Sequence, residues 1–272
     1  MVVFFKDGNG VIPTNANSIK FFKLYVAGFD TIPTGTTFFK AVSLSNLTAD
    51  KENASFPVSN ANDFSDPYLE YLSSDTTETI LELTFLDPIN VLFLANINFS
   101  SFKVTVDSVD STISSFKNSL TGRYNGVCFF DGDVNRITLT ITAQTPNDSA
   151  SYFSTGVICG GEKVSIDPRY NAGRSVAEPS DILRFDKNNK EVNNTGRTYH
   201  VFNINYSDIV STADIIKLKQ LQNSVGMDGT IIVYEYYTDR QTGIIGELTG
   251  TFDAIEKDVS YFDSILRIKE KV

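Results

Sequence analysis

Apolar and polar residues alternate with a period of two along much of this chain, a pattern that requires extended strands with one buried face. The alternation is cleanest over 137–142, where isoleucine and leucine alternate with threonine, and it recurs over 102–106 and 81–85. Residues 91–95 are apolar without interruption, which is typical of an interior strand packed on both faces. The pattern therefore predicts a mostly β protein.

Turn chemistry separates these strands in the sequence. Asp87-Pro88 and Asn125-Gly126 combine residues that restrict or free the backbone, and both are expected to end strands. The segment 131–135 begins like a calcium loop, with carboxylates at alternate positions. However, position six is Arg136 instead of glycine and position twelve is Thr142 instead of glutamate, so a hairpin turn is the better interpretation.

Composition changes near residue 165 and divides the 272 residues into two predicted domains. Residues 1–165 contain 17 of the 21 phenylalanines, and the polar stretch 167–174 that follows has little periodicity. At roughly 150 residues per domain, the length suits two modest units, each with its own core. We predict a β-sandwich over 1–165, beginning with a β-rich lead over 1–64, and a second β domain over 166–272.

One short helix is expected in the second domain, over Thr212–Val225. Ser211 can cap its first backbone N–H groups, Asp214 suits the helix dipole, and Gly226 can end it in a left-handed conformation. The apolar residues recur at helical spacing, as Ile215, Leu218, Leu221 and Val225. Strands are expected on either side of this helix, over 200–206, 230–237, 247–254 and 260–268.

The chain is acidic, with 33 Asp and Glu against 23 Lys and Arg and a formal net charge of −10. Binding to nucleic acid depends on clustered Lys and Arg, so no sequence-specific nucleic-acid partner is predicted. Residues 1–5 are apolar, but this run is too short for the core of a signal peptide. No stretch reaches the roughly 20 apolar residues that cross a bilayer, so membrane insertion is not expected.

Few side chains suit catalysis or metal binding. His200 is the sole histidine, and its strand places it on a face with apolar residues, although Ser207 and Asp208 lie nearby in sequence. No pattern brings a nucleophile, a base and an orienting acid together, so a structural histidine is predicted. With Cys128 and Cys159, the chain has three candidate zinc ligands, and a structural zinc site needs about four.

Both cysteines lie in apolar, strand-like runs and are predicted to be buried thiols. Gly160-Gly161 is followed by no helical pattern, so a phosphate-binding loop is not supported. No pair of acidic residues is singled out for glycoside hydrolysis. The sequence therefore predicts a protein that is not an enzyme, with no catalytic, cofactor-binding or metal-binding residue and no cofactor.

The order of motifs between residues 72 and 162 resembles the discoidin-type, galactose-binding-like jelly roll found in structural proteins of bacteriophage tails. In that module a buried strand ends in an Asn-rich turn, matched here by Asn96-Ile97-Asn98-Phe99. Ile97 replaces the family's turn histidine and Val134-Asn135 replaces an aromatic residue, so no sugar-binding residue is carried over. The segments that carry the likeness are 72–76, 79–85, 89–101, 135–141 and 154–162.

The second domain resembles the tail-tube-like domain of distal tail and baseplate proteins, in which a strand, a short capped helix and paired C-terminal strands follow one another. Together the two resemblances cover about residues 65–272, and residues 1–64 remain unmatched. In that family, the sheets of neighbouring copies join into a ring that continues the tail tube. The resemblance implies a virion structural protein, a distal-tail or baseplate ring component that is a suspected hexamer.

The same resemblance implies that the partners are other copies of this chain and other tail-tube and baseplate proteins. It also implies that these proteins assemble in the host bacterial cytoplasm and that the chain ends up in the virion tail. Such a protein would act through its sheet borders, because closing a ring removes exposed sheet edges. An alternative is a carbohydrate-binding module for a host glycan, in which Tyr68, Tyr71 or Tyr124 would stack on sugar rings. A more distant alternative is a hydrolase with dispersed carboxylates.

Overall fold

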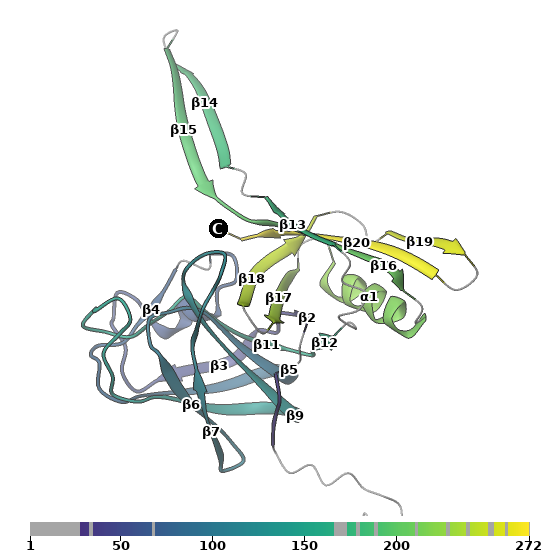
Figure 1. The fold of residues 1–272 in the computed structure, drawn as a ribbon. Coiled ribbons are helices and arrows are strands. Elements are labelled where there is room, and N and C mark those ends of the chain that lie inside the picture. Colours follow the sequence, from purple (N-terminus) through teal and green to yellow (C-terminus); the bar gives the residue numbers. More distant parts are fainter. Residues whose placement is uncertain are drawn as a thin grey trace, which may run out of the picture.

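The computed structural model is mostly β, as predicted, with a single α-helix among the described residues. Figure 1 shows the strands of the first half gathered below, a second sheet with the helix beside it, and one hairpin that projects from the body. The structure describes residues 28–32, 35–66, 69–165, 173–177, 180–187, 190–209, 212–226, 229–237, 240–249, 253–258 and 261–271.

Sheet A forms most of the first half of the chain. Its strands follow the order β11-β5-β9-β6-β7, with β3 paired to β5 and with β1 and β8 paired to β9. The short strands β4 (Tyr71–Leu72) and β10 (Ser154–Thr155) form a separate pair, and η2 (Val58–Asn62) is a short 3-10 helix. The strands of sheet A are β1 Phe29–Asp30, β3 Leu44–Ala49, β5 Thr79–Ile97, β6 Ser101–Val106, β7 Val109–Ser114, β8 Phe116–Lys117, β9 Tyr124–Ile141 and β11 Val157–Gly161.

Strands β5 and β9 are longer than the sequence indicates, and they overturn three predicted turns. Asp87-Pro88 lies inside β5, and both Asn125-Gly126 and the segment 131–135 lie inside β9. The β5–β9 ladder shifts register between Thr84 and Ile89, so the residues there bend the two strands instead of ending them. Residues on both sides of the bend join one core, which shows that sheet A curls around it.

The strand predicted to be buried on both faces is confirmed within β5. Leu92 and Leu94 are fully buried and point into the core that sheet A encloses. Val91, Phe93 and Ala95 alternate with them and point into a second core, which sheet A shares with the other sheet. An uninterrupted apolar run is what a strand between two cores requires.

Sheet B contains most of the second half of the chain and two strands from the first half. Its order is β12-β2-β17-β18-β20-β16-β13, and β19 also pairs with β20. Because β2 and β12 belong to residues 1–165, sheet B contains strands from both sides of the predicted domain boundary at residue 165. The division into two domains at that residue stays a prediction. The strands are β2 Gly35–Lys40, β12 Val164–Ser165, β13 Gly173–Ala177, β16 Val201–Ile209, β17 Thr230–Tyr237, β18 Arg240–Leu248, β19 Asp253–Asp258 and β20 Tyr261–Glu270.

Three of the four strands predicted in the second half are confirmed, as β16, β17 and β20. The fourth, over 247–254, is wrong, because β18 ends at Leu248 and β19 begins at Asp253. Gly243 and Gly246 interrupt the alternation of apolar and polar residues in β18, so the sequence pattern does not indicate this strand. Packing requires glycine at both positions, since an added β-carbon would lie 2.7 Å from side-chain atoms in both cases and, at Gly246, 2.5 Å from a backbone carbonyl oxygen.

The helix α1 spans Thr212–Val225, as predicted, and packs against sheet B. Gly226 follows it with φ +66°, the left-handed conformation of a C-terminal cap. The predicted capping residue Ser211 lies outside the described residues, as do most of the polar stretch 167–174 and residues 1–27 of the predicted β-rich lead. The buried residues of the helix are the predicted Ile215, Leu218, Leu221 and Val225.

Three hydrophobic clusters define the layers of the molecule. One lies inside sheet A, one between sheets A and B, and one between sheet B and α1. The middle cluster joins Phe93 and Phe129 of sheet A to Phe39, Ile232 and Tyr234 of sheet B, and all five side chains are buried. The two sheets are therefore held together by an apolar interior.

Candidate functional site

A hairpin that projects from the body is the most distinctive feature of the fold (Figure 1). β14 (Ser180–Lys187) pairs with β15 (Lys190–Thr198), and these two strands form a sheet with no third member among the described strands. We name this hairpin the arm. A two-stranded sheet is at best marginally stable in water, because it has two open edges and no opposing layer.

The arm is rooted in sheet B through the strands before and after it. β13 leads into β14, β15 leads into β16, and β13 pairs with β16 over its whole length. β13 is the last strand of sheet B, and β19 pairs with β20 alone among the described strands. Among the described strands, the outer borders of β13 and β19 and those of the arm have no neighbour, so their backbone N–H and C=O groups could pair with another chain.

One side of β18 is also left without a paired strand before Gly246, because β20 pairs with only Gly246–Leu248, but the first half of the chain covers this border of β18. The side-chain amides of Asn118 and Asn125 both donate to the carbonyl oxygen of Gly243, over 2.5 and 3.2 Å. The Ser119 N–H donates to the Gln241 carbonyl oxygen over 3.1 Å. These bonds satisfy edge groups of β18 within the chain, so this border is closed to a partner.

The root of the arm is held by the end of β20. Glu270 accepts a hydrogen bond from the His200 backbone N–H over 3.0 Å and also contacts the ring Nδ1, while its own N–H donates to the His200 carbonyl oxygen over 2.8 Å. Both residues are buried. Beside them, Lys269 Nζ lies 4.4 Å from the centre of the Tyr199 ring, a cation–π contact. The last residues before β16 are thus fixed to the body.

The sequence predicts a structural role for His200, and the structure places it in this buried contact. The sequence does not indicate Glu270 as the partner of His200, because residues paired across a sheet have no fixed spacing in sequence. The side chains of Ser207 and Asp208 lie outside the described residues.

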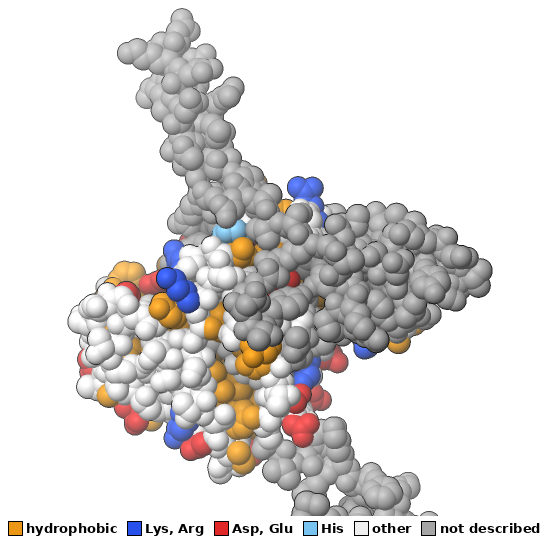
Figure 2. Space-filling model, in the orientation of Figure 1, with side chains coloured by type: hydrophobic (Ala, Val, Ile, Leu, Met, Phe, Trp, Pro, Cys, Tyr) orange, Lys and Arg blue, Asp and Glu red, His pale blue; other side chains and the backbone are white. Residues whose placement is uncertain are grey.

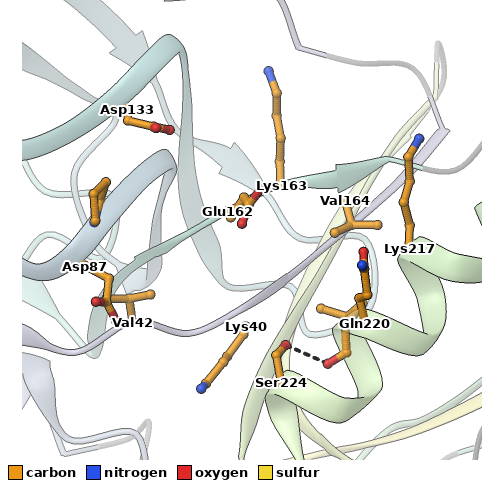
Figure 3. Close-up of a pocket in the computed structure, with 12 residues that line it drawn as sticks. Lys40, Val42, Asp87, Asp133, Glu162, Lys163, Val164, Lys217, Gln220 and Ser224 are labelled. Carbon is orange, nitrogen blue, oxygen red and sulfur yellow. Dashed lines mark hydrogen bonds between the residues drawn. The ribbon is translucent and has the colours of Figure 1, made fainter.

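A groove of about 840 Å³ lies between the bend of sheet A and α1 (Figure 3). Lys163 pairs with Asp30 at 2.6 Å and Lys217 pairs with Asp214 at 3.2 Å, and Figure 3 shows that the groove lysines do not converge on one point. Acidic and basic side chains are likewise interspersed over the described part of the face in Figure 2. The groove favours no single ligand chemistry. Its charged residues are Lys40, Asp87, Asp133, Glu162, Lys163 and Lys217.

A smaller cavity, of about 350 Å³, lies where β5 ends and β9 begins. We name it the end cavity. Glu70 precedes β4, Asn98 follows β5, Arg123 and Tyr124 lie at the start of β9, and Asp148 belongs to the loop between β9 and β10. The fold thus gathers two carboxylates, a guanidinium, an amide and a phenol ring from four distant segments. Of these residues, the sequence pattern indicates Tyr124 and the turn that contains Asn98.

Asn98 fixes the loop that carries Asp148. Its amide nitrogen donates to Asp148 Oδ1 over 3.2 Å and to the Tyr152 carbonyl oxygen over 3.0 Å. Its side-chain oxygen accepts the Ser154 N–H over 2.8 Å. The side chain is 5% exposed, so these bonds are shielded from water. The Asn-rich turn of the sequence therefore holds one wall of the end cavity in place.

Charges converge in the end cavity. Burial raises the pKa of Glu70, the nearby Arg123 guanidinium lowers that pKa, and the Asp148 carboxylate raises it. The net direction is upward, so the folded protein disfavours the ionised form of Glu70. A hydrogen-bond donor placed beside this carboxylate would relieve that cost.

The outcome differs among the three tyrosines considered for sugar stacking. Tyr71 is fully buried, its hydroxyl donates to the Lys51 carbonyl oxygen, and burial raises its pKa. It is therefore closed to a sugar ring. Tyr68 lies outside the described residues. Tyr124 lines the end cavity.

The remaining candidates take part in packing. Gly160 and Gly161 lie inside β11 and are buried, so they form no loop. Cys128 and Cys159 are free and buried, as predicted, and burial raises the pKa of both thiols, that of Cys128 to about 12. The described ranges contain no group of three or more His, Cys, Asp or Glu side chains arranged to hold a metal ion.

Within the described ranges, no helix has both the length and the hydropathy needed to cross a membrane. Comparison of the sequence with protein-family models and with curated proteins gives no match.

Proposed function

We propose that this chain is a structural subunit of a bacteriophage-type virion tail, a distal-tail or baseplate component that joins copies of itself into a ring and docks other tail proteins. The arm is the observation that carries the proposal. Two long strands that extend from the body without a third described strand gain backbone partners when another chain adds to them. A second copy of this chain is the partner to which the proposal commits.

The borders of sheet B support head-to-tail joining. A ring needs two different contact surfaces on each subunit, because identical patches would pair two copies and stop. β13 and β19 provide two distinct borders in the same sheet, whereas the amides of Asn118 and Asn125 cover the border of β18. Closing the ring would pair every such border and remove the exposed edges.

The proposed role places the protein in the virion tail, assembled in the host bacterial cytoplasm with tail-tube and baseplate proteins. A hexamer is the copy number suggested by the resemblance. Assembly requires complementary surfaces and no reactive group, so the subunit need not be an enzyme.

The test compares the assembly of the full chain with that of a variant in which a short Gly-Ser linker replaces residues 180–198. We expect the full chain to form rings, seen by native mass spectrometry and electron microscopy, and the variant without the arm to remain monomeric. As a control, the same linker is inserted at the Asp107–Ser108 turn between β6 and β7, which should leave assembly unchanged.

Folding of each variant is checked by its thermal unfolding transition, because a variant that fails to fold says nothing about the arm. A full chain that stays monomeric at high concentration, or a folded variant without the arm that still forms rings, would overturn the proposal. Locating the tagged chain at the tail tip of purified particles tests the virion assignment separately from self-assembly.

A further inference from the structure

We infer that the groove between the bend of sheet A and α1 binds residues 19–26 of the same chain. We name these residues the basic segment, because they comprise two lysines and six hydrophobic residues, with no acidic residue. The basic segment lies outside the described residues, which begin at Gly28. This contact within one chain goes beyond ring assembly and does not depend on it.

The charges that line the groove leave an excess of carboxylates. Lys163 and Lys217 already pair within the chain, with Asp30 and Asp214 respectively. The other charged residues of the lining form no ion pair with any described residue, and all of them are exposed: Asp87, Asp133, Glu162 and Lys40. Three carboxylates against one ammonium group leave a net charge of −2, which the two lysines of the basic segment would balance.

The carboxylates lie where a chain that comes from β1 would meet them. Figure 3 shows Asp87 and Asp133 on the side of the groove that sheet A forms, and Lys217 and Gln220 on the side that α1 forms. β1 pairs with β9, and Asp133 belongs to β9. The excess of negative charge is therefore on the side from which the basic segment would enter.

The direction of the chain at β1 leads toward the groove. The Gly28 carbonyl oxygen accepts the Asp131 N–H over 2.9 Å, so contact with β9 continues before β1 begins at Phe29. Because β1 and β9 are antiparallel, residues that precede Gly28 in this pairing run along β9 from Asp131 toward Asp133. Asp133 lines the groove, and only Ala27 separates Gly28 from the basic segment.

The border of β9 has room for this segment. On the side opposite β5, β1 pairs with Phe129 and Phe130, and β6 pairs with residues 138–140. Among the described strands, none pairs with β9 on this side between those two contacts. An extended segment here would supply backbone partners to a strand border that is otherwise left open.

The hydrophobic residues of the basic segment also match the groove. Its lining includes four apolar side chains, from Val42, Pro88, Val164 and Leu221. Each exposed ion pair and a small apolar contact contribute little by themselves. A tether of two residues, however, gives the segment a high effective concentration at the groove, so weak contacts suffice to hold it.

The first test is limited digestion of the full chain with trypsin, which cuts after lysine, in a dilute and monomeric sample. The rates of cleavage after Lys20 and Lys23 are measured by mass spectrometry and divided by the rate after Lys6, which lies outside the basic segment. We expect Asp87→Asn combined with Asp133→Asn to raise this ratio at least about threefold, because two exposed ion pairs are lost. High salt should raise the ratio of the parent in the same way.

The matched control is Glu78→Gln combined with Glu82→Gln, which removes two exposed carboxylates that do not line the groove. It should leave the ratio unchanged, and its new amide oxygen can still accept the Thr138 hydroxyl. Thermal unfolding transitions show whether each variant is folded. If folded groove and control variants were cleaved like the parent, the inference would be overturned.

The second test needs no variant. A carbodiimide joins a lysine amine directly to a carboxylate that it contacts, and we expect it to join Lys20 or Lys23 to Asp87, Asp133 or Glu162. An equal mixture of unlabelled and isotope-labelled chain distinguishes cross-links within one chain from those between two chains. Cross-links within one chain support the inference. Cross-links only between chains, or none from the basic segment to the groove, overturn it, and neither result bears on the role of the arm.

Discussion

A single added methyl group tests how closely β11 and β2 approach each other. Gly161 is buried at the end of β11, and a β-carbon there would lie 2.4 Å from the Lys40 carbonyl oxygen, a backbone atom that cannot rotate away. We expect Gly161→Ala to lower the free energy of unfolding by about 1–3 kcal/mol, as overpacking does. Urea unfolding measures the change, with Ser74→Ala at an exposed position as the control. Equal midpoints for the two variants would show that this contact is not tight.

The contact between His200 and Glu270 gives a second prediction for single residues. Glu270→Ala removes the acceptor of the His200 backbone N–H and leaves that buried donor without its partner. Leaving a buried backbone donor without its acceptor costs about 1–3 kcal/mol, and we expect a loss of that size in urea unfolding. Glu270→Gln retains an acceptor oxygen and should lose less. If Glu270→Ala unfolded like Glu162→Ala, an exposed control, the pair would contribute nothing to stability.

For single residues, the sequence predicts whether a side chain is buried better than it predicts which residue that side chain contacts. The apolar residues beside His200, Cys128 and Cys159 indicate that these side chains are buried, and the structure places all three inside. The partner of His200 is 70 residues away, and no local pattern encodes that distance. The end cavity could not be predicted for the same reason, because Glu70 and Asp148 lie before two strands, β4 and β10, whose pairing no local pattern encodes.

Elements whose ends are defined locally could be predicted with accurate bounds. The helix α1 has apolar residues at helical spacing and a terminal glycine in a left-handed conformation, and both signals are contained in one short segment. The turn residues inside β5 and β9 do not end these strands, because a bulge in a long strand uses the same residues as a turn. Whether Asp87-Pro88 ends a strand or bends it depends on the partner strand, which the local sequence does not specify.

The hydrogen bonds that cover the border of β18 can be weakened by a single substitution at Asn125. Asn125→Asp keeps the oxygen that accepts the Asn96 N–H, but it replaces the donor to the Gly243 carbonyl oxygen with a second acceptor. When ionised, the new carboxylate would be buried and face a carbonyl oxygen. Its pKa in the folded state is therefore expected to lie above the ordinary value near 3.9.

A carboxyl whose pKa is raised by folding stabilises the protein below its ordinary pKa, and this contribution is lost as the pH rises through the folded-state value. We therefore expect Asn125→Asp to unfold at a lower urea concentration than the parent at pH 7, and the gap to narrow toward pH 4. The exposed variant Asn46→Asp should show no comparable dependence. A gap that stayed constant with pH would mean that the amide of Asn125 is dispensable.

The molecule as a whole combines a layered, apolar body with a thin projection. The body buries three clusters of hydrophobic side chains, and its two sheets share the middle one. The arm consists of two strands beyond that body. Stability should therefore be unevenly distributed, with high free energies of local opening in the body and low ones in the arm.

Hydrogen exchange can show whether assembly changes this distribution. In a dilute, monomeric sample, the amides of 180–198 should exchange quickly, because a two-stranded hairpin opens at little cost. In a concentrated, ring-forming sample, pairing with a neighbouring copy should slow them at least about tenfold, since opening would first require that pairing to break. Amides of 91–95, inside β5, should stay protected in both samples and serve as the reference. If exchange in the arm did not depend on concentration, the arm would not be part of the contact between copies, and the proposed mode of assembly would be overturned.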